Sequence, residues 1–152
     1  MDLQTYLNNA VAAQRKETLA RSDQLTLGEL ILKIEPIAAR QESTIKTYAH
    51  EAMVQYDFEN LFPTLIDSWR GSYCELALNF KTEGEKLTVT AFLQMLKDTI
   101  GKTLEGYKGG DFLMSKHTPV WVANYGNSGN TAVIEVIDEE HTVIIVTGYR
   151  TL

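Results

Sequence analysis

Residues 67–73, with the sequence DSWRGSY, combine side chains that suit an anionic or planar ligand. Arg70 offers a rigid fork of donors to anionic oxygens, and Gly71 lets a ligand approach the backbone closely. Trp69 and Tyr73 can stack on a ring. The segment therefore predicts a ligand-binding loop. The alternative is a turn that leads into a strand, with the arginine paired to a neighbouring carboxylate.

A second polar segment, residues 102–111 (KTLEGYKGGD), places glycines beside a lysine. It follows a predicted helix, so it is not the phosphate loop that lies between a strand and a helix. The backbone N–H groups of Gly109 and Gly110 can still cradle a phosphate. Lys108 would add a positive charge there, and Tyr107 would add an aromatic ring. The alternative is a glycine-rich helix end followed by a loop.

The run NYGNSGNT at residues 124–131 joins two predicted strands. As a ligand loop, it offers the ring of Tyr125 for stacking, and the amide of Asn127 and the hydroxyl of Ser128 for polar contacts. A hairpin turn explains the same residues, because Asn and Gly tolerate positive φ angles. Trp121, on the strand before this run, is either a core residue or a stacking platform.

Evidence for catalysis or metal binding is weak in this sequence. Cys74 lies within an alternating strand, where a cysteine behaves as a small inert hydrophobic residue. His50, His117 and His141 are scattered, without the HxxxH or HxH spacing of metal sites. The acidic run at residues 138–140 predicts a solvated hairpin tip. We therefore predict no catalytic residues, no metal and no cofactor.

The whole chain has 152 residues and a formal net charge of −6. This length suits a single domain over residues 1–152. The acidic balance argues against general nucleic-acid binding, which normally needs a basic surface. A single cysteine excludes an intrachain disulfide and favours a reducing cytoplasm. The sequence has neither a signal-peptide pattern nor an apolar run of the ~18 residues that cross a membrane, so we expect no membrane partner.

The first 24 residues stand apart from the rest of the pattern. Residues 2–20 predict a helix with a thin apolar stripe, which is either an ordinary surface helix or an arm, within residues 1–24, to another subunit. Residues 37–50 have no clear pattern. They are a connector, a short helix or the approach to the first strand.

Two further helices carry clearer signals. Thr26 opens the capping box TLGE, and Pro36 should end that helix at the preceding residue. Thr88 is the N-cap of the other, whose core stripe extends to Leu104. Gly106 can then end this helix in a left-handed cap.

The remaining elements are strands, recognised by alternation or by β-branched and aromatic residues. They are predicted at residues 53–58, 73–80, 120–125, 131–137 and 142–149. The segment at residues 59–71 is predicted as a connection. Short polar joins make the last three strands an antiparallel meander. The order α-α-β-β-α-β-β-β predicts an α+β fold, with helices packed on one face of a mostly antiparallel sheet of about five strands.

Several segments resemble a family of small uncharacterised accessory proteins of tailed bacteriophages. They are LTLGELI at residues 25–31, DSWRGSYCELAL at 67–78, the stretch at 88–112 that ends in GYKGGDF, and TPVWVANYGNSGNTAV at 118–133. The SxRGxY and GYKGG motifs carry the likeness. The resemblance implies a phage accessory role in the host cytoplasm, such as countering host defence.

The leading functional hypothesis is a non-catalytic binder of a small anionic ligand, such as a nucleotide immune signal that it sequesters. Arg70 and Lys108 would pair with phosphate, while the aromatic side chains would stack on a base. A homo-oligomer would let facing pockets close over the ligand.

Two alternatives remain open from the sequence. One is an acidic inhibitor that presents carboxylates, including those at residues 138–140, to the basic groove of a host defence protein. The other is a small nucleotide hydrolase that uses Asp67, Asp111 and His117, although these residues have no diagnostic spacing.

Overall fold

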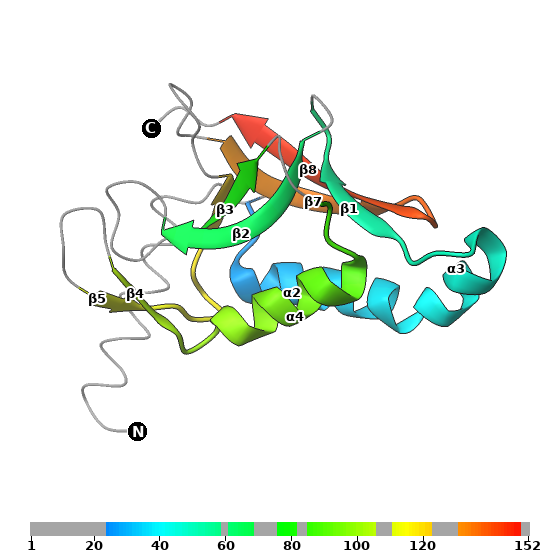
Figure 1. Cartoon of the computed structure of the whole chain (residues 1–152). Helices are drawn as coiled ribbons and strands as arrows, with labels where there is room; N and C mark the ends of the chain where they lie inside the picture. Colours follow the sequence, from blue (N-terminus) through cyan, green and yellow to red (C-terminus); the bar gives the residue numbers. More distant parts are fainter. Residues whose placement is uncertain are drawn as a thin grey trace.

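The computed structural model describes residues 24–58, 61–68, 76–81, 85–105, 111–122 and 131–149 (Figure 1). The helices in these ranges are α2 (Leu27–Ala39), α3 (Gln41–Tyr48) and α4 (Val89–Thr99). The strands are β1 (Met53–Tyr56), β2 (Phe62–Ser68), β3 (Leu76–Lys81), β4 (Thr103–Glu105), β5 (Asp111–Leu113), β6 (Val120–Val122), β7 (Thr131–Asp138) and β8 (Thr142–Tyr149). The predicted helix at residues 2–20, on which the arm hypothesis rests, lies outside the described residues.

The main sheet has the strand order β1-β8-β7-β6-β3-β2, and β4 pairs with β5 in a separate hairpin. The sheet curls until its two edge strands, β1 and β2, come into contact. The pairings β1–β8 and β3–β6 are parallel, whereas the other three pairings of this sheet are antiparallel. Helices α2 and α4 lie side by side against one face (Figure 1). The α+β prediction is confirmed, and so is the antiparallel β6–β7–β8 meander.

Helix α2 begins where the sequence predicts. Thr26 accepts a hydrogen bond from the backbone N–H of Glu29, whose side chain accepts one in return from the backbone of Thr26. The predicted end at Pro36 is wrong, because the helix continues to Ala39 with the proline inside it. A proline in a helix interior costs about 3 kcal/mol. Burial of Ile37 in the core just beyond it offsets that cost.

Helix α4 ends earlier than predicted, at Thr99 instead of Leu104. Gly101 adopts φ +83°, a conformation that favours glycine, and its N–H donates to the carbonyl of Met114 at 2.8 Å. This turn redirects the chain into β4. Leu104 therefore packs against the core from a strand. The proposed cap at Gly106 lies outside the described residues.

Strand β2 occupies much of the predicted connection at residues 59–71, so that prediction is wrong. Pro63 and the short polar residues near it are typical of turns, so the pattern did not indicate a strand. The structure tolerates the proline because β2 is an edge strand, and the pairing with β3 shifts register between Pro63 and Leu65. A proline at such a bulge does not break the sheet.

Candidate functional site

The predicted ligand-binding residues belong to three segments outside the described residues. They are Trp69, Arg70, Gly71, Tyr73, Tyr107, Lys108, Gly109, Gly110, Tyr125, Asn127 and Ser128. Their roles remain predictions. The described strand ends on either side of them nevertheless fix the points at which the three segments join the fold.

Two of these attachment points lie in the same part of the molecule. Ser68 pairs with Leu76 at the end of the β2–β3 hairpin, from which residues 69–75 extend. Glu105 pairs with Asp111 at the end of the β4–β5 hairpin, from which residues 106–110 extend. β2 contacts β4, and Figure 1 shows the tip of β2 on the same side as the small hairpin. The chain therefore brings the two attachment points to one side.

The third segment attaches elsewhere. Strands β3 and β6 are parallel, with Leu76 opposite Val120 and Leu78 opposite Val122. The chain therefore leaves β6 at Val122, beside Leu78 of β3. Residues 69–75 instead join the sheet at Leu76, so the two segments attach at different positions along β3.

A groove of about 490 Å³ lies between β2, α4 and β4, and we call it the β2–α4 groove. Its apolar lining comes from all three elements. These residues are Leu65, Ile66, Ala91, Met95 and Leu104. Leu65 is 50% exposed, so this lining is open to solvent. Such a surface suits the flat face of an aromatic ring.

The same groove has a polar rim. The side-chain amide of Gln94 donates a hydrogen bond through its Nε2 atom to Oδ1 of Asp98 at 2.7 Å. The hydroxyl of Thr99 is already bonded to the carbonyl of Met95 at 2.8 Å. Lys102 is exposed, and its ammonium forms no ion pair with any residue that the structure describes. Among the described residues, the rim therefore offers one cation without an ion pair, one amide and one carboxylate.

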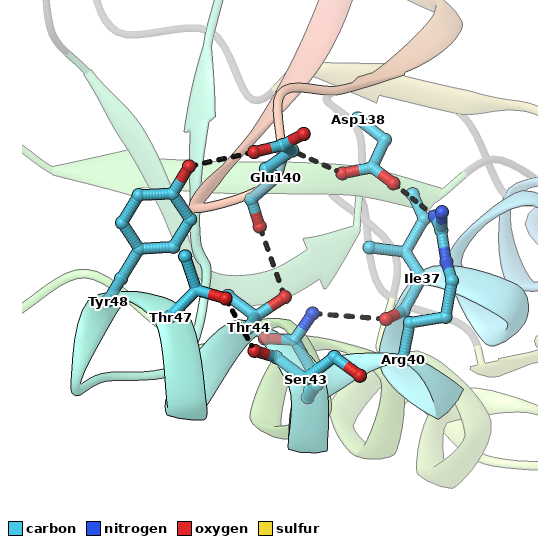
Figure 2. A pocket seen from close by; sticks show the side chains of 9 residues that line it. Ile37, Arg40, Ser43, Thr44, Thr47, Tyr48, Asp138 and Glu140 are labelled. Carbon is cyan, nitrogen blue, oxygen red and sulfur yellow. Dashed lines mark hydrogen bonds and ion pairs between the residues drawn. The ribbon is translucent and has the colours of Figure 1, made fainter.

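A second, smaller cavity of about 250 Å³ lies between α3 and the β7–β8 turn (Figure 2). Arg40 forms an ion pair with Asp138, whose other oxygen accepts a hydrogen bond from the backbone N–H of Glu140 at 3.0 Å. Tyr48 donates its hydroxyl proton to Oε2 of Glu140 at 2.7 Å. The hydroxyl of Thr44 donates to the carbonyl of Glu140 at 3.4 Å.

Residues 138–140 form the exposed tip of the β7–β8 hairpin, as predicted. Their contacts with α3 were not predicted. No local pattern indicates these contacts, because Arg40 and Asp138 are 98 residues apart. The hydrogen bond to Glu140 and the nearby charge, with a contribution from burial, raise the pKa of Tyr48 above its ordinary value.

The remaining candidates for chemistry are separated. Trp121 is fully buried, so the core interpretation holds and the stacking platform is excluded. His50, His117 and His141 are exposed. Within the described ranges, no three His, Cys, Asp or Glu residues gather in a way that could hold a metal ion. Within the same ranges, no helix is both long and apolar enough to cross a membrane.

The side chains of Asp67 and Asp111 lie outside the described residues, so the hydrolase alternative remains untested. The resemblance to phage accessory proteins also stays a prediction from the sequence. Comparisons with protein-family models, curated proteins and solved structures found no match to this chain.

Proposed function

We propose that the protein binds a small anionic ligand, a nucleotide, without converting it, and that the β2–α4 groove holds the ring of that ligand. One observation supports this most directly. Leu65 and Ile66, which lead directly into residues 67–73, line the same groove as Lys102 and Leu104, which belong to residues 102–111.

The lining of the groove agrees with the two halves of a nucleotide. Leu65, Ile66 and Met95 supply an apolar surface for the base. Lys102 supplies a cation at the rim, and Arg70 and Lys108 belong to the attached segments. Because the protein carries a net charge of −6, a phosphate needs such a local concentration of positive groups.

The carboxylate of Asp98 sets the orientation of the ligand within the groove. It repels phosphate, so the phosphate is expected at the Lys102 side and the base nearer to α4. The Gln94 amide, which is bonded to Asp98, can then contact polar atoms at the edge of the base.

Thermal unfolding with a panel of nucleoside mono-, di- and cyclic phosphates tests the proposal. A ligand at 100 times its Kd adds about 2.7 kcal/mol of stability, which raises the Tm of a chain of this size by roughly 5–10 °C. Arg70→Ala, Lys102→Ala and Lys108→Ala should each reduce this shift. Lys46→Ala is the control, because Lys46 pairs with Glu42 on the exposed surface of α3. If no nucleotide shifts the Tm, the proposal fails.

The biological role that we propose is sequestration of a nucleotide immune signal in the host cytoplasm. A binder should release its ligand chemically intact when the protein is denatured. Mass spectrometry of the released molecules tests this, and recovery of a cleaved product would favour the hydrolase alternative. Sedimentation with and without ligand tests the expected homo-oligomer.

The fixed acidic turn favours a second candidate, an inhibitor that presents carboxylates to a basic partner. Arg40 and Tyr48 hold Asp138 and Glu140 in place, and Glu139 stays exposed beside them. Glu139→Lys reverses charge without removing those contacts. This candidate would be favoured over the nucleotide binder if Glu139→Lys no longer inhibited the host defence protein while Arg70→Ala inhibited it fully.

A further inference from the structure

Helix α3 and the residue before it, residues 40–48, form a segment that we call the α3 strap. Gln41 is the only buried residue of this helix. By contrast, α4 buries Val89, Phe92 and Leu96 completely. Apolar burial is the main source of helix stability in proteins, so the strap must be held in another way.

Polar side chains provide that attachment, and three of them, those of Arg40, Thr44 and Tyr48, reach the same turn. Arg40 pairs with Asp138 at the start of the strap, and Tyr48 donates to Glu140 at its end. Figure 2 shows the two carboxylates facing the helix across the cavity. Each contact is exposed to solvent, where hydrogen bonds and ion pairs contribute little individually.

The cavity of about 250 Å³ between the strap and the turn indicates that apolar packing is incomplete there. Ile45, the largest aliphatic side chain of α3, is 46% exposed. The ring of Tyr48, which is 36% exposed, lies against His141 with the ring centroids 4.6 Å apart, so separating the strap from the turn exposes mainly this one ring. The hydrophobic cost of opening is correspondingly small.

Gln41 marks the fixed end of the strap. Its Oε1 atom accepts a hydrogen bond from the backbone N–H of Ala52 at 2.7 Å, and its Nε2 atom donates to the carbonyl of Ile37 at 3.0 Å. Ala49 ends the helix at the other side with φ 62°. The start of the helix is thus tied to the core, and its last turn is held mainly through Thr44 and Tyr48.

We infer that the α3 strap swings away from the acidic turn about its fixed start at Gln41, while α2, α4 and the sheet stay folded. Opening breaks the hydrogen bonds from Thr44 and Tyr48 to Glu140. The strap is thus a conformational device that releases the carboxylate of Glu140 from its partner in α3. Local opening of this kind draws on segments with few buried apolar contacts.

Hydrogen exchange of the full chain, followed by mass spectrometry, tests this inference. We expect amides of α3 to exchange at least ~100-fold faster than those of α4. The exchange of α3 should also be insensitive to low urea, whereas that of α4 should accelerate with urea because it requires global unfolding. Equal rates, or the same urea dependence in both helices, would overturn the inference.

We call the contacts between the α3 strap and the acidic turn the α3 latch. Two matched variants distinguish loss of this latch from general destabilisation of the fold. Tyr48→Phe removes the hydroxyl that binds Glu140, so it should speed exchange in α3 several-fold and leave α4 unchanged. Glu42→Gln breaks only the exposed pair with Lys46, 3.7 Å long, and should leave both helices nearly unchanged. If Tyr48→Phe does not alter α3 exchange, or speeds α3 and α4 equally, this hydrogen bond is not the latch.

Discussion

Helices α3 and α4 share a fold but are held in it by different forces. In α4, Val89, Phe92 and Leu96 are completely buried between the sheet and α2. In α3, the only buried side chain is the polar Gln41. The difference indicates that α4 belongs to the cooperative core, whereas α3 is a separate unit of lower stability.

The two helices also serve different parts of the molecule (Figure 1). One face of α4, from Ala91 to Thr99, forms a wall of the β2–α4 groove, while α3 contacts the acidic turn. A binding groove gains from a rigid wall, because positioned side chains lose less entropy when the ligand arrives. The proposed ligand site thus lies on the rigid helix, and the proposed opening is confined to the other.

Removing a core side chain of α4 should have the largest effect. Phe92→Ala should reduce the free energy of unfolding by about 3–5 kcal/mol, because a buried phenyl ring leaves a cavity. Urea denaturation measures this loss. Leu32→Ala is the control on α2, since Leu32 is 69% exposed and should cost far less. Similar losses for both variants would contradict the assignment of α4 to the core.

Removing the anchor of the strap should have an intermediate effect. Gln41→Ala leaves the buried N–H of Ala52 without its acceptor, which costs about 1–3 kcal/mol. Ile45→Ala shortens an exposed side chain of the same helix, so it tests whether the loss comes from the anchor or from shortening any side chain of α3. Urea denaturation of both variants decides between these causes. A larger loss in Ile45→Ala would show that α3 is held by apolar packing after all.

The contrast between the helices also explains what the sequence could predict. The start of α4 was predictable because Thr88 caps it and its apolar residues recur at helical spacing. The end of α2 was not, since the burial of Ile37 outweighs the local effect of Pro36. Local patterns report local preferences, and long-range packing can override them.

The same reasoning applies to the two candidate sites. Residues 67–73 and 102–111 were recognisable from their composition, yet the proximity of their attachment points depends on the pairing of β2 with β3 and on the contact of β2 with β4. The α3 latch had no sequence signal at all. Arg40 and Tyr48 are ordinary surface residues until the fold brings the acidic turn beside them.

A smaller effect is expected from the ion pair of the strap. Arg40 has a side chain that is 62% exposed, and Asp138 one that is 25% exposed. A double-mutant cycle with Arg40→Ala and Asp138→Asn should give a coupling energy of about 0.2–1 kcal/mol, as for other surface pairs. Unfolding in urea provides the four free energies. A coupling of several kcal/mol would mean that this pair, and not Gln41, is the main anchor.

The smallest effect is expected in the titration of Tyr48 in α3, which we compare with that of the buried Tyr56. Burial raises the pKa of Tyr56 well above the ordinary value of 10.0, whereas the hydrogen bond to Glu140 is the main cause of the raised pKa of Tyr48. The titratable and charged groups beside Tyr48 come from the strap and the acidic turn. Glu140 accepts its hydrogen bond, the ring of His141 lies 4.6 Å away, and Arg40 and Asp138 line the same cavity.

A raised pKa means that the folded protein favours the protonated phenol. The stability from Tyr48 is therefore complete below pH 10.0 and is lost as the pH rises through the raised pKa, when the phenolate and Glu140 repel each other. Absorbance titration of the wild type minus Tyr48→Phe isolates this group. We expect Glu140→Gln to lower the pKa of Tyr48, because the charged acceptor is gone, and to leave Tyr56 protonated until the core unfolds. An unchanged titration in Glu140→Gln would show that the turn does not hold the helix through this hydroxyl.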